Sequence, residues 1–342
     1  MSDAAIRQAL RDLQAGKLPD ETSSEIVFES IMRGDATPSQ IGALLMGLSI
    51  RGETAEVVAG AARAMRAAAS RIEPKAQGLL DTCGTGGSGV STLNISTTVA
   101  FVVAACGVPV AKHGNRAISS RSGSADVLEA LGVNLSLSPQ QVADCIDAVG
   151  IGFLFAPAHH PAMKHASAPR RELGIRSIFN LLGPLTNPAG AEFQVLGVYA
   201  EDRLELVAGA LSRLGAERAL VVHGRDGMDE ITTTTITDAV LVQKGHSPER
   251  FEIDPAAFGI PYSAATALQG GDAAQNAAII RHILAGQKGA GRDIVLLNAA
   301  ACLWVAGKAD GIPQGLKLAA ESIDSGRAEA KLEALIAQSR KA

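Results

Sequence analysis

The sequence predicts an α/β fold in which a small all-helical domain precedes a larger domain with a mostly parallel central sheet and flanking helices. Residues 1–70 contain only helical patterns, whereas from Gly78 onward short apolar runs typical of strands alternate with helical segments. We therefore expect a helical domain at residues 1–70 and an α/β domain at residues 74–342. Helical character returns after a strand within residues 161–188, which indicates that this segment rejoins the helical domain.

The helical domain is predicted by its caps and its apolar spacing. Residues 37–40, Thr-Pro-Ser-Gln, form a capping box with proline at the first helical position, and apolar residues repeat at helical spacing through 41–48. A further helix is expected over residues 54–69, and an earlier one near 25–31. No phosphate loop or catalytic cluster occurs here, so this region is interpreted as a packing or oligomerisation module.

The α/β domain is predicted from the same kinds of pattern. Residues 138–141, Ser-Pro-Gln-Gln, form a second capping box. The expected helices cover residues 94–106, 122–132, 138–149, 161–174, 204–214, 272–285, 292–306 and 315–338. The expected strands cover residues 78–80, 108–111, 151–155, 195–200 and 218–223, with 232–243 as an extended strand or hairpin at the edge of the sheet.

The composition excludes several classes of protein. Hydrophobic residues make up 47% of the 342 residues and charged residues 19%, which is typical of a compact globular chain and not of a disordered one. Aromatic residues make up 3% and the net charge is −4, so nucleic acid is not an expected partner. The four cysteines form no CxxC pair, which indicates a reducing compartment. Without a signal-peptide core or an apolar run of ~20 residues, we expect a cytoplasmic protein with no membrane partner.

The first candidate site is a glycine-rich loop within residues 81–97. Four glycines, Gly84, Gly86, Gly87 and Gly89, follow a short apolar run and precede an apolar helix. Glycine lets backbone N–H groups approach a ligand closely, and the N-terminus of a helix favours negative charge. The expected ligand is a phosphate ester.

Two other phosphate motifs fit this loop less well. The spacing of Gly84, Gly86 and Gly89 satisfies the dinucleotide fingerprint, which also requires an acidic residue about 20 positions on, after the second strand. Here the second strand is followed by the basic residues of 112–116, and no lysine follows Gly89 as in a P-loop. A lone glycine-rich sequence is more often a surface loop without a ligand, but a second loop of suitable chemistry comes next.

This second candidate loop covers residues 112–124 and contains Lys112, Arg116 and several serines. Such side chains and the amides of a helix start can neutralise and hydrogen-bond a polyphosphate. A solvated basic loop is the alternative. The position after a strand favours a binding site, because ligands of α/β proteins bind at the carboxyl ends of strands.

Three smaller features have candidate roles. Asp229 and Glu230 follow the strand at 218–223, and adjacent carboxylates on a loop suit Mg²⁺ that is shared with substrate phosphates. His159 and His160 have no cysteine or carboxylate at zinc spacing, so they are interpreted as lining a pocket or capping a helix. Arg170 offers a guanidinium to a carboxylate substrate, and a surface ion pair is an equally good interpretation.

Four motifs together resemble those of the anthranilate phosphoribosyltransferase family. They occur in order over nearly the whole chain: Gly84-Thr-Gly-Gly…Asn94-Ile-Ser-Thr97, Lys112-His-Gly-Asn-Arg-Ala…Ser119-Ser120, Phe179-Asn-Leu-Leu-Gly-Pro-Leu-Thr-Asn187-Pro188 and Gly227-Met-Asp-Glu-Ile-Thr-Thr233. The resemblance implies a nucleoside phosphorylase/phosphoribosyltransferase-like fold and a homodimer through the helical domain. It also implies a Mg²⁺-assisted pentosyltransferase that moves phosphoribose from phosphoribosyl pyrophosphate to the amine of anthranilate, the second step of tryptophan biosynthesis.

The resemblance also implies roles for single residues. Gly84 is expected where the two substrates meet, and Asn115 and Arg170 are expected to hold anthranilate. Mg²⁺ on the pyrophosphate is expected to contact Ser96, Asp229 and Glu230. The residues expected to bind phosphoribosyl pyrophosphate are Gly84, Gly87, Ser88, Thr92, Asn94, Ile95, Ser96, Thr97, Lys112, His113, Gly114, Asn115, Arg116, Ala117, Ile118, Ser119, Ser120 and Ser124. No general base is assigned, because a neutral aromatic amine already has its lone pair.

Two motifs depart from the family pattern. Ser88 stands where the family usually has aspartate, and Thr235 and Ile236 stand where the family usually has Gly-Pro. A pyrimidine nucleoside phosphorylase is the alternative enzyme, although it should lack the motifs at 112–116 and 179–188. The non-enzymatic alternative is a sensor of phosphoribosyl ligands with the same fold, if Ser88 marks lost activity.

Overall fold

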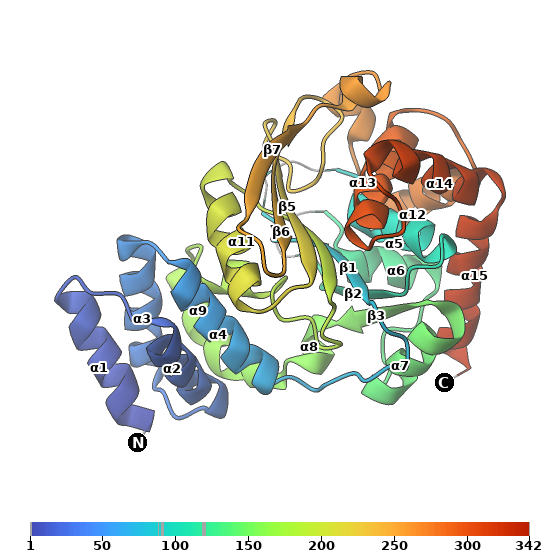
Figure 1. Cartoon of the computed structure of the whole chain (residues 1–342). Helices are drawn as coiled ribbons and strands as arrows, with labels where there is room; N and C mark the ends of the chain where they lie inside the picture. Colours follow the sequence, from blue (N-terminus) through green and yellow to red (C-terminus); the bar gives the residue numbers. More distant parts are fainter. Residues whose placement is uncertain (1, 88, 90–91, 118–120, 342) are drawn as a thin grey trace.

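The computed structural model describes residues 2–87, 89, 92–117 and 121–341, and it contains a helical domain beside an α/β domain (Figure 1). The helical domain begins with α1 (Ser2–Gln14), α2 (Glu21–Arg33), α3 (Pro38–Arg51) and α4 (Ala55–Ala67). The predicted capping box is present at the start of α3, where Thr37 and Gln40 bond each other's backbone N–H groups. Asp20 and Thr54 cap α2 and α4 with one bond each, because a side-chain oxygen accepts from the backbone N–H three residues on.

A later segment of the chain returns to these helices. It comprises α8 (Ala156–His159), the 3-10 turn η1 (Pro161–Met163), α9 (Lys164–Leu173) and α10 (Phe179–Leu182). Helix α9 packs against α2 and α3, and α10 packs against α4. The helix that the sequence predicts over 161–174 therefore starts as a 3-10 turn and continues as α9.

In the described part of the chain, seven strands form one sheet in the order β3-β2-β1-β4-β5-β6-β7. Their bounds are β1 (Leu80–Gly84), β2 (Val110–Gly114), β3 (Ile151–Phe155), β4 (Phe193–Gly197), β5 (Arg218–Gly224), β6 (Thr237–Gln243) and β7 (Glu249–Ile253). Strands β1 to β5 pair in parallel, whereas β6 is antiparallel to both β5 and β7. The mostly parallel sheet is confirmed.

The strand order creates a topological switch beside β1. The chain runs from β1 to β2 and β3 on one side, and then returns to β4 on the other side of β1. The register pairs Gly84 at the end of β1 with Gly197 at the end of β4. Ligands of open parallel sheets bind in the crevice at the carboxyl ends of the strands at such a point.

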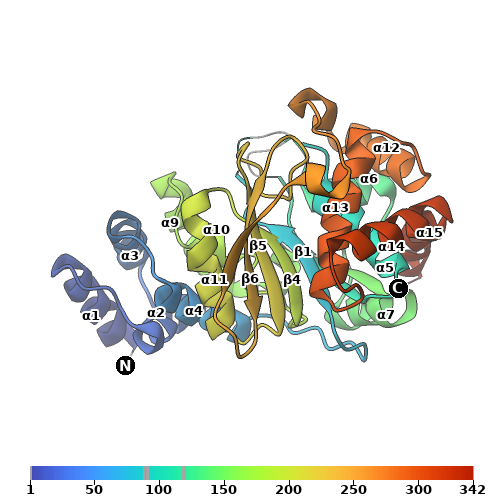
Figure 2. The same cartoon turned by 45° about the horizontal axis from the view of Figure 1, so that its top comes forward.

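Helices cover both faces of the sheet (Figure 2), and the buried apolar residues form two large hydrophobic cores and a smaller cluster between α7 (Pro139–Val149) and strands β2 and β3. One large core contains α5 (Ile95–Ala105), α13 (Ala290–Val305), α14 (Ile312–Asp324) and α15 (Arg327–Arg340). The other large core is continuous from the helical domain through α10 and α11 (Leu204–Arg213) to the sheet. Residues of β5 alternate between the two cores, with Leu220 and Val222 in the first and Ala219 and Val221 in the second. Burial on both faces is why the strands read as apolar runs.

The remaining elements are α6 (Ser124–Leu131), α12 (Ala273–Leu284) and the 3-10 turns η2 (Glu201–Arg203), η3 (Pro255–Phe258) and η4 (Ala265–Leu268). None of the helices in the described ranges is both long and apolar enough to cross a bilayer.

Five expectations about elements are corrected. Strand β1 covers 80–84 instead of 78–80, and β2 covers 110–114 instead of 108–111, so each strand includes the first residues of the loop predicted to follow it. The helix predicted over 315–338 is two helices, α14 and α15, because the chain turns at Gly326, which has a φ of 76°. Residues 232–236 are a loop, so β6 begins only at Thr237, and β7 forms the edge of the sheet in its place. Strand β4 covers 193–197 instead of 195–200.

Candidate active site

The glycine loop leaves the end of β1 and is held from two sides. The Thr85 N–H donates to the carbonyl of Gly197 on β4 at 2.9 Å, and the Gly86 N–H donates to the Asp229 carboxylate at 2.9 Å. A Cβ atom at Gly84 would lie 2.5 Å from that carboxylate, so this close approach requires glycine. Gly86, Gly87 and Gly89 have φ between 68° and 77°, the left-handed region that glycine adopts without strain. Ser88 lies outside the described residues.

The acidic pair after β5 reaches both the glycine loop and helix α5. Asp229 lies against Gly84 and Gly86, while Glu230 accepts a hydrogen bond from the Ser96 N–H at 3.2 Å. Burial, together with the neighbouring charge of Asp229, raises the pKa of Glu230 well above its usual range. The structure thus brings together Ser96, Asp229 and Glu230, the three residues that the resemblance assigns to Mg²⁺.

Lys112, at the third position of β2, is buried beside them. Its ammonium donates to the backbone carbonyl of Thr82 and lies 3.4 Å from the Ser96 hydroxyl. A buried ammonium next to Glu230 balances part of the negative charge of the acidic pair. Lys112 lies beside the N-terminus of α5 and is buried, so the loops cover its ammonium and it does not reach the open surface.

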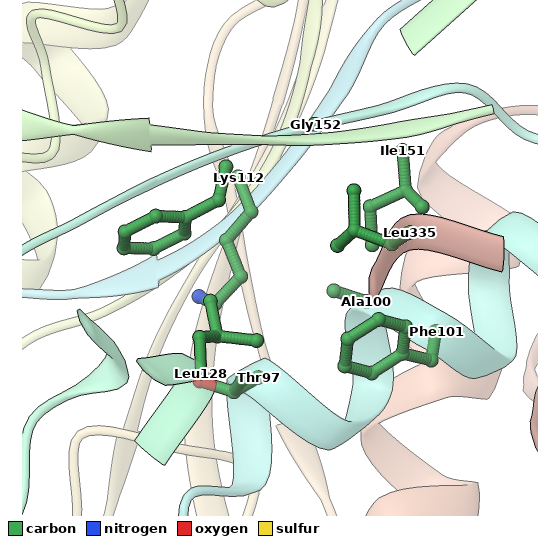
Figure 3. A pocket seen from close by; sticks show the side chains of 9 residues that line it. Thr97, Ala100, Phe101, Lys112, Leu128, Ile151, Gly152 and Leu335 are labelled. Atoms are coloured by element: carbon green, nitrogen blue, oxygen red, sulfur yellow. The ribbon is translucent and has the colours of Figure 1, made fainter. Parts of the chain in front are cut away.

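Several residues that were predicted to bind phosphoribosyl pyrophosphate make contacts within the protein instead. Asn94 donates to the carbonyl of Ser122 at 3.2 Å and accepts from Asn276 at 2.8 Å, so its amide ties the two loops and α12 together. Ile95 and Thr97 are both 1% exposed, and Ile95 belongs to the hydrophobic core. Figure 3 shows Thr97 and Lys112 lining an interior cavity of about 10 Å³, room for about one water molecule.

The second loop is organised by Asp126 of α6. Its carboxylate accepts from the backbone N–H groups of Ala117 and Gly123, both at 2.9 Å. The carbonyl of Asn115 accepts from the Ser124 hydroxyl at 3.3 Å, and Gly114 lies close against that hydroxyl. Ile118, Ser119 and Ser120, also predicted here, lie outside the described residues. Thr92 is paired through its backbone with Gln269.

Arg116 does not extend into the phosphate region. It forms a two-pronged ion pair with Glu129 at 2.8 and 3.1 Å, and it also bonds Asp126 at 3.1 Å. These partners raise the pKa of Arg116 above its usual value. In this arrangement the guanidinium holds the loop to α6, and its predicted contact with phosphoribosyl pyrophosphate would require it to leave both acids.

His113 is buried and not a cationic ligand. Its Nε2 atom has no hydrogen-bond partner among the described residues, and its ring centroid lies 5.1 Å from that of His160. Burial, and then the charge of His160, lower the pKa of His113 to about 3, so the ring is neutral at pH 7. The backbone N–H of His113 donates to Asp81 at 3.1 Å.

Arg170, predicted to pair with anthranilate, lies on α9 and is half-buried. Its guanidinium carbon is 4.9 Å from the centroid of the Phe179 ring, and burial lowers its pKa. No carboxylate partner of Arg170 is found among the described residues. The interpretation as a surface ion pair therefore loses its support.

Sequence reasoning missed four residues that shape the site. Asp81 and Asn187 join β1 to β2, because Asn187 donates to the Asp81 carboxylate and to the Ala111 carbonyl, both at 2.8 Å. Burial raises the pKa of Asp81 to about 6. Arg176 and Tyr199 contact the glycine loop. Asn187 stands in a quoted motif and Asp81 begins the stretch 81–97, so both could have been noticed, whereas Arg176 and Tyr199 have no local pattern.

Together these residues form a site that suits a phosphorylated ligand. Backbone amides of the glycine loop, the N-terminus of α5 and the start of α6 surround the carboxyl ends of β1, β2 and β4. Within the described ranges, no three histidine, cysteine, aspartate or glutamate side chains gather into a metal-binding group. The acidic pair thus supplies only part of the ligand set that a cation requires.

Comparison with known families agrees with this architecture. Residues 7–69 match the glycosyl transferase family, helical bundle domain, and residues 76–329 match the glycosyl transferase family, a/b domain. Anthranilate phosphoribosyltransferase of Acetivibrio thermocellus is 53% identical over 97% of this chain and 96% of its own length. That of Paramagnetospirillum magneticum is 54% identical over 98% and 96%.

Solved structures show the same likeness. Anthranilate phosphoribosyltransferase from Thermus thermophilus is 45% identical and superposes with a TM-score of 0.92 over 97% of this chain and 99% of its own. The enzyme from Saccharomyces cerevisiae, solved in complex with phosphoribosyl pyrophosphate and Mg, is 26% identical with a TM-score of 0.90 over 100% and 99%. With such identity over nearly its full length, the chain belongs to the anthranilate phosphoribosyltransferase family of glycosyltransferases.

Proposed function

We propose that this chain transfers the 5-phosphoribosyl group of phosphoribosyl pyrophosphate to the amine of anthranilate, giving N-(5-phosphoribosyl)anthranilate and pyrophosphate, the second step of tryptophan biosynthesis. The observation that supports it best is the convergence of the glycine loop, Asp229 and the Ser96–Glu230 pair at the switch point of the sheet. The family relationship and the donor-bound relative support the same reaction.

The donor set at this point fits Mg²⁺. Ser96, Asp229 and Glu230 offer only hard oxygen atoms, and the remaining ligands would come from the pyrophosphate and water. When bound, Mg²⁺ supplies positive charge against the departing pyrophosphate. Glu230 accepts a hydrogen bond from the Ser96 N–H. Its pKa is raised by burial and then by the neighbouring charge of Asp229, and a bound cation would offset both effects.

The protein's own residues would supply orientation and charge stabilisation. N–H groups of the glycine loop and of α5 donate to the donor's phosphates, and Asp126 keeps the second loop in place through Ala117 and Gly123. Arg170 and Asn115 hold anthranilate, with the guanidinium paired to its carboxylate. The neutral amine attacks the sugar carbon as the carbon–oxygen bond to pyrophosphate breaks, and the nitrogen then loses its extra proton to water or to the released pyrophosphate. Positioning supplies much of the rate.

A fluorescence assay tests this function. Purified protein is mixed with anthranilate, phosphoribosyl pyrophosphate and Mg²⁺, and the loss of anthranilate fluorescence is followed. Consumption is expected only when both the donor and the divalent metal are present. Phosphorolysis of thymidine or uridine without anthranilate turnover would replace the proposal with the nucleoside phosphorylase alternative, and binding without any turnover would favour a sensor.

We further propose a homodimer through the helical domain. Ile26, Met46 and Ile50 are large apolar side chains of this domain that are exposed in the single chain, Ile50 by 73%. We propose two domains: a helical domain of residues 1–70, which the segment 161–188 rejoins, and an α/β domain of residues 74–342. The proposed compartment is the cytoplasm. Sedimentation of the wild-type protein and of Ile50→Glu tests the dimer.

A further inference from the structure

Arg176 contacts the glycine loop from a segment that the sequence assigns no role. It lies between α9 and α10, and its guanidinium donates to the carbonyl of Gly87. The guanidinium carbon also lies 4.4 Å from the centroid of the Tyr199 ring, close enough for a cation–π interaction. Three segments far apart in the chain therefore meet at this side chain.

The contact completes a row of anchors on the loop. Thr85 is bonded to the end of β4 through Gly197, and its hydroxyl accepts from the Tyr199 N–H at 3.0 Å. Gly86 is bonded to Asp229, and Gly87 is bonded to Arg176. Three consecutive residues are thus held from three sides, and Arg176 holds the one farthest from the strand.

The chemistry of the contact requires arginine and glycine. A planar guanidinium can stack on a ring with its face while it donates from its edge, which a lysine ammonium cannot do. Gly87 has a φ of 73°, which favours glycine, whereas a Cβ atom there would meet the guanidinium at an ordinary contact distance of 3.4 Å. The hydrogen bond that the Gly87 carbonyl accepts from Arg176 turns this carbonyl outward. A loop that binds phosphate through its N–H groups needs its carbonyls to point away from the phosphate.

We propose that Arg176 is a positioning residue that holds the glycine loop in the conformation that binds the phosphoribosyl donor. The inference rests on the proposed function of this site. It predicts a selective effect. Loss of Arg176 weakens binding of the phosphoribosyl donor, whereas binding of anthranilate, which is assigned to Arg170 and Asn115, changes little.

The test compares Arg176→Ala and Arg176→Lys with a matched control. Arg218 makes the same pair of contacts, with its guanidinium carbon 4.7 Å from the Trp304 ring centroid and a bond of 2.9 Å to the Trp304 carbonyl. It begins β5, at the opposite end of the strand from the site. Arg218→Ala therefore removes an equivalent contact without touching the loops.

For Arg176→Ala we expect the KM for phosphoribosyl pyrophosphate to rise about tenfold or more, the loss expected for one charge-assisted bond. The Kd of the donor, measured by calorimetry with Mg²⁺, should rise by the same factor, and the KM for anthranilate should stay within about twofold. Arg176→Lys should lie between Ala and wild type, and Tyr199→Leu should shift the donor constants in the same direction. Arg218→Ala should lower Tm and leave both KM values unchanged.

Unchanged donor constants in Arg176→Ala, or an equal rise for both substrates, would overturn the inference. A fall in Tm alone, as in Arg218→Ala, would do the same, because it would make the contact merely structural. If the wild-type protein consumes no anthranilate, the proposed function fails. The calorimetric comparison of donor binding still decides the role of Arg176 in that case.

Discussion

Gly84→Ala tests how closely the acidic pair approaches the glycine loop. The added Cβ atom would lie 2.5 Å from Asp229 Oδ2, whereas ordinary contact begins at 3.4 Å, so the carboxylate must move by about 0.9 Å. Gly84 has no positive φ, so backbone strain does not contribute. The change is therefore a local displacement of one carboxylate.

The displacement should break the 2.9 Å bond between the Gly86 N–H and Asp229. A hydrogen bond to a charged group contributes about 1.5–3 kcal/mol, and each 1.4 kcal/mol is a factor of ten. We therefore expect kcat/KM for phosphoribosyl pyrophosphate to fall roughly ten- to a hundredfold, with a higher Mg²⁺ concentration needed for half-maximal rate. The assay is the loss of anthranilate fluorescence during a Mg²⁺ titration at fixed substrate.

Gly42→Ala is the matched control, because a Cβ atom at this helical position meets nothing within 4 Å. Its rate and Mg²⁺ response should equal those of the wild type, with Tm unchanged or slightly raised. If Gly84→Ala has the same Mg²⁺ response as Gly42→Ala, Asp229 has no role with the metal. A large fall in Tm would instead show that Gly84 serves the fold.

Three other changes have definite expected outcomes. Arg170→Ala should raise the KM for anthranilate by roughly ten- to a hundredfold, because one charge-assisted bond is lost, and should leave the KM for the donor unchanged. Equal effects on both KM values would mean that Arg170 has a structural role. The pKa of His113 is lowered to about 3 from 6.5, so its neutral form stabilises the fold above pH 6.5 and this contribution is lost as pH falls toward 3. Urea unfolding of His113→Gln between pH 7 and 4 should show a weaker pH dependence, by up to about 1.4 kcal/mol per pH unit, and identical slopes would contradict the burial argument. Ser88→Asp restores the family's carboxylate and should change the response to Mg²⁺ and donor by ~1–2 kcal/mol, with anthranilate less affected; superimposable titrations would make position 88 a tolerant loop site.

Features that depend on neighbouring residues could be predicted from the sequence. The capping boxes at Thr37 and Ser138 bond atoms within three positions of each other, so four residues contain the whole signal. The glycine loop, the basic loop and Asp229-Glu230 are also short runs of neighbouring residues, so the sequence alone reveals each of them and the strand that it follows. The class of ligand followed, because amides, cations and carboxylates at strand ends have few other uses.

Local pattern failed where packing decides. Strand β7 contains Glu249, Arg250 and Glu252, which tolerate solvent at a sheet edge, so no apolar run announces it. The break at Gly326 had a local signal in Ser325 and Gly326, but the apolar spacing continues across it. At both places the position of the residues in the fold decides the structure, and the spacing of apolar residues along the sequence does not reveal it.

The sequence by itself determined the fold class, the family and the loops, and it predicted candidate residues for the site. Only the tertiary structure decided which atoms meet: Asp229 lies on Gly86 across 143 positions, and Arg176 lies on Gly87 across 89. It also turned Arg116 toward Glu129 and buried His113 beside His160. The physical reason is the strand order, which places β4 next to β1 and β5 next to β4. This order brings loops that are distant in the sequence to one edge of the sheet, and no local run of residues encodes it.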